Sequence, residues 1–128
     1  MKDGTIMTEY YFWDTFAMIE LIKNNSKFVK YLSMQSATSS LNLMELYFNI
    51  LRFSDEKNAD RQLVEWSYFS KPIPERIMKE AMKFKLQHKK QRLSYIDCMG
   101  YVFAVMNGMK FLTGDKQFEG LPHVEFVR

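Results

Sequence analysis

The sequence predicts an α/β domain in which helices cover both faces of a short, mainly parallel sheet. Short apolar runs alternate with longer segments whose apolar residues recur at helical spacing. Two of these runs stop at residues that favour helix starts or turns, as expected where strands lead into helices. Hydrophobic residues make up 47% of the chain, which is enough to form one buried core at this length.

The N-terminal half is predicted to start with a buried aromatic strand at 10–13. It stops at Asp14 and Thr15, which favour the start of a helix. This helix is expected to end at Asn24 and Asn25, because apolar residues repeat at helical spacing up to that point. Further helices are predicted over 26–33, 41–53 and 56–68, with a short strand or extended turn over 34–39.

The C-terminal half begins after Pro72 and Pro74, which interrupt the chain. A long helix is predicted from residue 74 to about 90, and its exposed face is expected to carry Lys79, Lys83, Lys85, Lys89 and Lys90. Ser94-x-x-Asp97 resembles a capping box and opens an apolar helix over 95–107, which Gly108 ends. Strands are expected over 111–113 and, at the sheet edge, over 124–127.

Composition excludes several classes of protein. The lone cysteine, Cys98, cannot form an internal disulfide, and with two histidines the chain is too poor in ligands for a Cys/His metal motif. A net charge of +3 permits binding to a polyanion but does not require it. No apolar run approaches the length that spans a bilayer, and the first residues lack the apolar region typical of a signal peptide. We therefore expect one cytoplasmic domain over 1–128, with residues 1–7 as a disordered lead.

Four acidic residues lie where chemistry is expected. Asp14 and Asp115 each follow a strand, and parallel α/β sheets bind ligands at the carboxyl ends of their strands. Asp97 lies in the first turn of a buried helix, and Glu45 lies mid-helix between apolar neighbours. If the four converge, repulsion would protonate some of them unless a hard divalent cation were bound. Mg²⁺ or Mn²⁺ at such a site hydrolyses phosphodiesters without a Ser, His or Cys nucleophile.

Each acid also has a structural interpretation when it is taken alone. Asp14 could be only a helix N-cap, worth about 1 kcal/mol. Asp97 could merely complete a capping box, and Asp115 could be a turn residue. Glu45 could be an ordinary surface residue. The hypothesis of a metal site therefore depends on all four acids together.

The basic and aromatic residues have interpretations of their own. A solvated helix surface is favoured over RNA contact for the lysines of 79–90. Lys116, beside Asp115, is better placed to meet a phosphate. Core packing is favoured for Cys98, and it is favoured over base stacking for the aromatic residues Tyr10, Tyr11 and Trp13.

Four segments occur in the order and at about the spacing of one known family. They are Tyr11-Phe12-Trp13-Asp14-Thr15, Leu43-Met44-Glu45-Leu46, Leu93-Ser94-Tyr95-Ile96-Asp97 with Ala104 beyond it, and Phe111-Leu112-Thr113-Gly114-Asp115-Lys116-Gln117-Phe118. Through them the chain, from about Tyr10 to Val127, resembles the PIN-domain nucleases, most closely the small VapC-type toxins of prokaryotic toxin–antitoxin pairs. The ordered set is more specific than any one segment.

The resemblance implies a three-layer α/β/α PIN-like fold and hydrolysis of RNA phosphodiester bonds with Mg²⁺ or Mn²⁺. Asp14, Glu45, Asp97 and Asp115 match the family's catalytic, metal-binding acids. Thr15 and Thr113 match supporting hydroxyl positions, with Lys116 as a further supporting candidate. Family members are often homodimers and are held inactive by an antitoxin protein whose tail covers the site.

The chain departs from the family pattern at three places. Phe16 stands where a small or polar residue is common, Gln117 stands where a further acid often lies, and no glycine precedes Leu93. Two alternative functions stay open. One is a catalytically silent PIN-like domain that binds RNA or a protein, and the other is a PIN nuclease of RNA processing, or one that cuts DNA.

Overall fold

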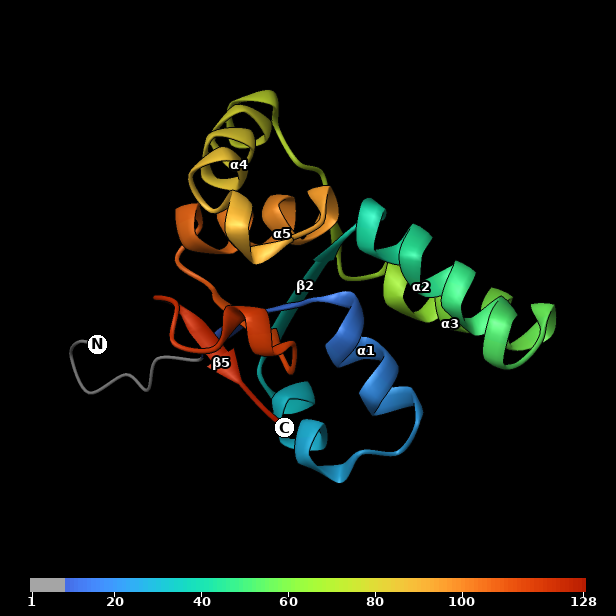
Figure 1. The fold of residues 1–128 in the computed structure, drawn as a ribbon. Coiled ribbons are helices and arrows are strands. Elements are labelled where there is room, and N and C mark those ends of the chain that lie inside the picture. The colour runs from blue at the N-terminus through green and yellow to red at the C-terminus, as the bar shows by residue number, and fades with distance from the viewer. Residues whose placement is uncertain (1–8) are drawn as a thin grey trace.

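The structure is a computed structural model that describes residues 9–128, so the disordered lead expected at 1–7 lies outside the described residues. A five-stranded sheet forms its centre, with the strand order β3-β2-β1-β4-β5 (Figure 1). Each neighbouring pair is parallel. The strands are β1 (Tyr10–Trp13), β2 (Gln35–Ser39), β3 (Ser70–Lys71), β4 (Lys110–Thr113) and β5 (Val124–Phe126).

Helices cover both faces of this sheet. They are α1 (Thr15–Ile22), α2 (Ser40–Phe53), α3 (Glu56–Ser67), α4 (Glu75–Gln87) and α5 (Tyr95–Met106), with 3-10 helices η1 (Ser26–Ser33), η2 (Lys89–Gln91) and η3 (Lys116–Phe118). In Figure 1, α4 and α5 lie on one side of the sheet and α1 on the other, while α2 and α3 form a hairpin that projects sideways. No helix within 9–128 combines the length and apolarity that a membrane span requires.

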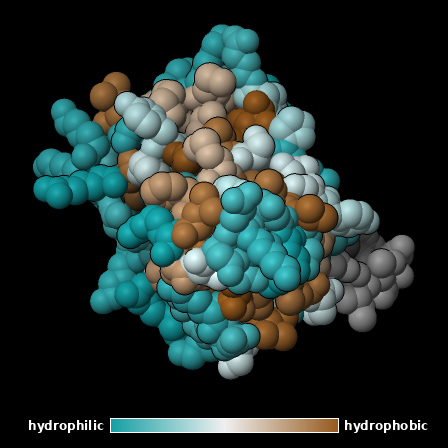
Figure 2. Space-filling model, turned by 90° about the vertical axis from the view of Figure 1, so that its right-hand side faces the viewer, coloured by the Kyte–Doolittle hydropathy of each residue, from teal (hydrophilic) through white to brown (hydrophobic). Residues whose placement is uncertain are grey.

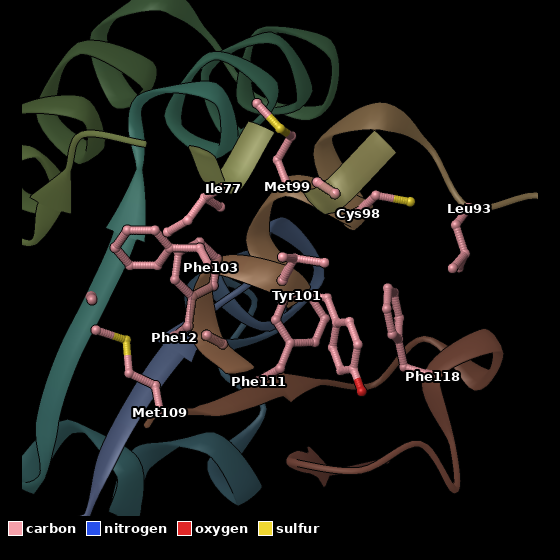
Figure 3. Packing of buried hydrophobic residues seen from close by; sticks show 14 residues of the cluster. Phe12, Ile77, Leu93, Cys98, Met99, Tyr101, Phe103, Met109, Phe111 and Phe118 are labelled. Atoms are coloured by element: carbon pink, nitrogen blue, oxygen red, sulfur yellow. The ribbon is translucent and has the colours of Figure 1, made fainter. Parts of the chain in front are cut away.

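Alternation along β1 divides the core between the two faces. Phe12 points towards α5 and packs among Phe103 and Phe111, as Figure 3 shows. Its neighbours Tyr11 and Trp13 face the opposite side and join the cluster beneath α1, η1, α2 and α3. Because successive strand residues point to opposite faces, one short aromatic run serves both halves of the core. The three-layer α/β/α arrangement around a parallel sheet is thus confirmed.

The helix boundaries differ from the predictions at a few places. Segment 26–33 is helical but winds as a 3-10 helix, and the two-residue strand β3 was not predicted. The long helix ends at Gln87 and not near 90, with Pro74 as its N-cap. Lys85 does not belong to the exposed lysine face, because it is half-buried and its ammonium donates to the carbonyl of Leu93 at 2.5 Å.

Candidate active site

Asp14 is buried at the carboxyl end of β1, where it caps the N-terminus of α1. Its Oδ1 accepts a hydrogen bond of 2.8 Å from the backbone N–H of Ala17. Its Oδ2 accepts a short hydrogen bond of 2.5 Å from the hydroxyl of Thr113, at the end of β4. An aspartate that directly follows a strand and caps a helix needs only local chain geometry to reach this position. The two hydrogen bonds fix its carboxylate between β1 and β4.

Asp115 lies at the same edge of the sheet, just beyond the end of β4. Its backbone N–H donates to Thr113 Oγ1 at 3.0 Å, so one hydroxyl joins Asp14 to the Asp115 turn. The Oδ1 atom of Asp115 accepts a hydrogen bond of 3.0 Å from the N–H of Gln117 and caps η3. Lys116 is exposed beside it. The structure therefore places Thr113 between two of the predicted acids.

Asp97 lies in the first turn of α5, in the capping box that the sequence predicts. The Ser94 N–H donates to Asp97 Oδ2, and the Asp97 N–H donates to Ser94 Oγ, both at 3.0 Å. Lys85 reaches the same turn from α4 through its hydrogen bond to Leu93. These contacts use one carboxylate oxygen of Asp97 and fix the start of α5.

Glu45 is half-buried on α2 and contacts α1 through a chain of polar side chains. The hydroxyl of Thr15 donates to Glu45 Oε1 at 2.6 Å, and the amide of Asn42 donates to Thr15 Oγ1 at 3.2 Å. The hydroxyl of Ser39, which caps α2, donates to Asn42 Oδ1 at 2.6 Å. The network fixes the position of Glu45 relative to α1, since each polar group in it has a partner.

Asn42 and Ser39 were not among the predicted site residues. Asn42 is a buried polar residue that lies between two apolar residues, Leu41 and Leu43. Two signals in the sequence pointed to it. It stands three residues after a helix-capping serine and three residues before Glu45, so it shares a helix face with the acid.

The acids interact electrostatically. Burial raises the pKa of Asp14 from its ordinary value of 3.8 to about 8, and the negative charges of Asp97 and Asp115 also raise it. The hydrogen bonds from Thr113 and Ala17 lower this pKa but do not offset the effect of burial. Burial also raises the pKa of Glu45, to which the charge of Asp97 adds. For Asp97, burial and the charge of Asp115 raise the pKa, while Ser94 and Lys85 oppose the shift. Each of these three carboxyls is therefore harder to ionise, because the charge of another of the four acids acts on it.

The donor chemistry fits a hard divalent cation. The acids offer only oxygen ligands, which Mg²⁺ and Mn²⁺ prefer, and a cation would relieve the repulsion that raises these pKa values. Within residues 9–128, however, no three Asp, Glu, His or Cys side chains lie close enough to hold one ion. Asp97 and Asp115 each accept a local backbone hydrogen bond. Side-chain rotation at these two positions would be needed to complete a shared coordination shell.

The remaining predicted residues near the site pack in the core. Tyr11, Trp13 and Cys98 are buried, and Figure 3 shows Cys98 among the apolar side chains above the sheet. Trp13 donates its indole N–H to Ser36 at 3.0 Å and packs against Trp66. These aromatic rings are not available for stacking on a nucleobase.

The fold has counterparts among solved structures. A toxin–antitoxin complex from Klebsiella pneumoniae has a TM-score of 0.71 at 22% identity, covering 90% of this chain and 95% of that chain. VapC20 from Mycobacterium tuberculosis, a sarcin–ricin loop cleaving toxin, has a TM-score of 0.74 at 16% identity, covering 92% of this chain and 98% of that chain. VapBC2 from Rickettsia felis, bound to a promoter DNA fragment, has a TM-score of 0.73 at 14% identity, covering 92% of this chain and 97% of that chain.

These similarities establish the fold. A sequence comparison with curated proteins gave no match. The family model described as the PIN domain matches residues 11–124. That range runs from β1 into β5 and contains all four predicted acids. The chain therefore belongs to the PIN domain family.

Proposed function

We propose that the protein is a metal-dependent endoribonuclease and the toxin of a toxin–antitoxin pair. One observation carries the nuclease assignment: the hydroxyl of Thr113 joins the buried carboxylate of Asp14 to the Asp115 turn, so two acids lie together at the carboxyl edge of the sheet. Packing alone gives no reason to bring these charges together. Membership of the PIN domain family supports the assignment. We expect the protein to act in the cytoplasm.

Asp14, Glu45, Asp97 and Asp115 are the proposed ligands of Mg²⁺ or Mn²⁺. When bound, the ion would offset charge on the scissile phosphate and lower the pKa of the attacking water. Thr113 keeps the carboxylate of Asp14 oriented by its hydrogen bond to Oδ2. The Ser39–Asn42–Thr15 network does the same for Glu45.

In the proposed reaction, the water oxygen forms a bond to phosphorus while the bond from phosphorus to the 3′ oxygen breaks. The proton released by the water balances the one gained by the leaving 3′ oxygen, so the products are a 5′-phosphate and a 3′-hydroxyl. Burial helps this chemistry, because charges in a partly dry site interact more strongly than they do in water. Lys116 is exposed beside Asp115, where a phosphate would approach.

An antitoxin partner is supported by the surface of the α2–α3 hairpin. Exposed apolar side chains there are Met44, Phe48, Leu51, Val64 and Tyr68, with exposures from 43% to 85%. Figure 2 shows brown side chains gathered among teal ones on the side that carries these helices. A groove of about 590 Å³ between the helices includes Leu43 and Leu63 in its walls. Adjacent exposed apolar groups of this kind mark protein interfaces.

The nuclease assignment is tested with Asp14→Asn and the matched variant Asp55→Asn. Both aspartates cap a helix and accept an N–H at 2.8 Å, but Asp55 is exposed on α3. In Mn²⁺, Asp14→Asn should reduce cleavage of an oligoribonucleotide about 100-fold or more, as loss of a metal ligand would. Asp55→Asn should cleave like the wild type. Undiminished cleavage by folded Asp14→Asn would refute the site.

Three further measurements test the other parts of the proposal. Matched ribo- and deoxyribo-oligonucleotides distinguish an RNase from a DNase, and we expect cleavage of the RNA only. The protein encoded by the adjacent reading frame should bind and inhibit the enzyme if it is an antitoxin. Sedimentation of the free protein tests the homodimer that the resemblance implies. An active enzyme with no such inhibitor would favour a role in RNA processing.

A further inference from the structure

A basic groove lies between η1 and the end of β5, with a volume of about 540 Å³. Its charged walls are formed by Lys27, Lys30, Glu125 and Arg128, with Tyr31 beneath them. Lys27 and Arg128 are 101 positions apart in the sequence, and the ammonium of Lys27 donates to the Arg128 carbonyl at 2.6 Å. This contact holds the C-terminal segment against η1, so the three cations share one surface.

Glu125, the acidic side chain among the described residues that line the groove, already has partners. The hydroxyl of Tyr31 donates to Glu125 Oε2 at 2.7 Å. The ammonium of Lys110, on β4, lies 4.0 Å from Glu125 Oε1. Because Lys110 offsets the charge of Glu125, the groove keeps an excess of positive charge available to an anion.

Arg128 connects the groove to the acidic site. Its guanidinium donates to the carbonyl of Gly114, the residue before Asp115, and lies 5.8 Å from the centre of the Phe16 ring. Phe16 is one of the positions at which the chain departs from the family pattern, and it follows Asp14 by two residues. A Cβ on Gly114 would lie 2.3 Å from the Phe16 ring, so this packing requires glycine. The guanidinium therefore sits on the rim of the acidic site.

We propose that this groove binds a backbone phosphate of the RNA strand, a short distance along the chain from the scissile phosphate. The inference rests on the proposed nuclease function. Guanidinium and ammonium groups are the usual partners of phosphate oxygens, and Arg128 has a planar donor face that suits them. An acidic segment of a protein partner would match the same charges. RNA is favoured because Arg128, in the wall of the groove, bonds to Gly114, the residue before the proposed metal ligand Asp115.

The test measures RNA binding separately from cleavage. In an Asp14→Asn background, the anisotropy of a labelled single-stranded oligoribonucleotide gives Kd at several salt concentrations. Arg128→Gln and Lys30→Gln should each weaken binding several-fold at low salt. Each should also reduce the slope of log Kd against log salt by about 0.7, the value for one lost phosphate contact on a single strand. Lys79→Gln, an equal change of charge on α4 across the sheet, should leave both quantities unchanged.

The two variants separate a phosphate contact from a structural role. Arg128 also bonds to Gly114, so Arg128→Gln could disturb the Asp115 turn, and such a disturbance would weaken binding without changing the salt slope. Lys30 has no hydrogen bond to that turn and lies over the Tyr31 ring at 5.3 Å. Wild-type salt slopes in both variants would overturn the inference, and binding of the partner protein instead of RNA would then be the explanation to pursue. Absence of cleavage by the wild type would refute only the proposed function.

Discussion

Replacing Asp14 by Asn should stabilise the metal-free protein, and the gain should grow with pH. Burial raises the pKa of this carboxyl from 3.8 to about 8, so the folded chain holds a proton that the unfolded chain releases over that interval. Since the folded state binds more protons, its stability is greatest below pH 3.8 and falls as the pH rises towards 8. At about 1.4 kcal/mol per pH unit, the loss reaches about 4 kcal/mol at pH 7.

Asparagine removes this titration while it keeps the helix cap. Asn is as good an N-cap as Asp, and its side-chain oxygen can still accept the N–H of Ala17. Between pH 4.5 and pH 7, the free energy of unfolding of Asp14→Asn should therefore rise relative to wild type by about 3 kcal/mol. Urea unfolding in EDTA gives this difference, and the fluorescence of buried Trp13 and Trp66 reports the transition.

The matched control is again Asp55→Asn. Its carboxylate makes the same capping hydrogen bond at an exposed position, so this variant shows what loss of a capping carboxylate does without burial. Parallel pH profiles for Asp14→Asn and wild type would refute the account, because they would mean that Asp14 titrates alike in the folded and unfolded chain. Lower stability of Asp14→Asn at pH 7 would refute it too.

Three further variants test the contacts that hold the site. Gly114→Ala should destabilise the fold by about 1–3 kcal/mol in urea unfolding, because the new methyl group meets the Phe16 ring, and full stability would contradict the packing described. Ser94→Ala removes the N-cap of α5 and should lower the unfolding free energy by about 1 kcal/mol. An unchanged midpoint of urea unfolding would contradict a stabilising role for this cap. Thr15→Val removes the donor to Glu45 and should reduce RNA cleavage in Mn²⁺ about 10-fold, whereas wild-type rates would show that this hydrogen bond does not position Glu45 for cleavage.

The sequence predicts the fold well because its strongest signals are local. The aromatic run at Tyr10–Trp13 and the capping residues Asp14 and Ser94 define their elements without help from distant parts of the chain. The strand β3 was not predicted, because Ser70 and Lys71 show no apolar pattern and form a strand only by pairing with β2. The 3-10 winding of η1 also depends on packing, since its apolar spacing fits an α-helix equally well.

The sequence predicts the candidate site less completely than the fold, because contacts between distant residues complete the site. Asp14, Asp97 and Asp115 stand at strand ends and helix starts, which are visible locally. The hydrogen bond between Thr15 and Glu45 joins residues 30 positions apart and arises only when α1 packs on α2. The spacing of Asn42 from Ser39 and Glu45 is visible in the sequence, but its hydrogen bond to Thr15 also depends on that packing. Rotamers decide whether the carboxylates share one ion, and residue spacing does not specify them.

Diffraction from crystals of the protein soaked in Mn²⁺ tests the shared metal site most directly. We expect an anomalous peak at the carboxyl edge of the sheet, about 2.0–2.2 Å from oxygens of Asp14 and of at least one of Asp97 and Asp115. In the manganese complex, the carboxylates of Asp97 and Asp115 should no longer accept the backbone hydrogen bonds from Ser94 and Gln117. A fully soaked crystal with no manganese at this edge, and with the carboxylates in their present rotamers, would contradict the claim.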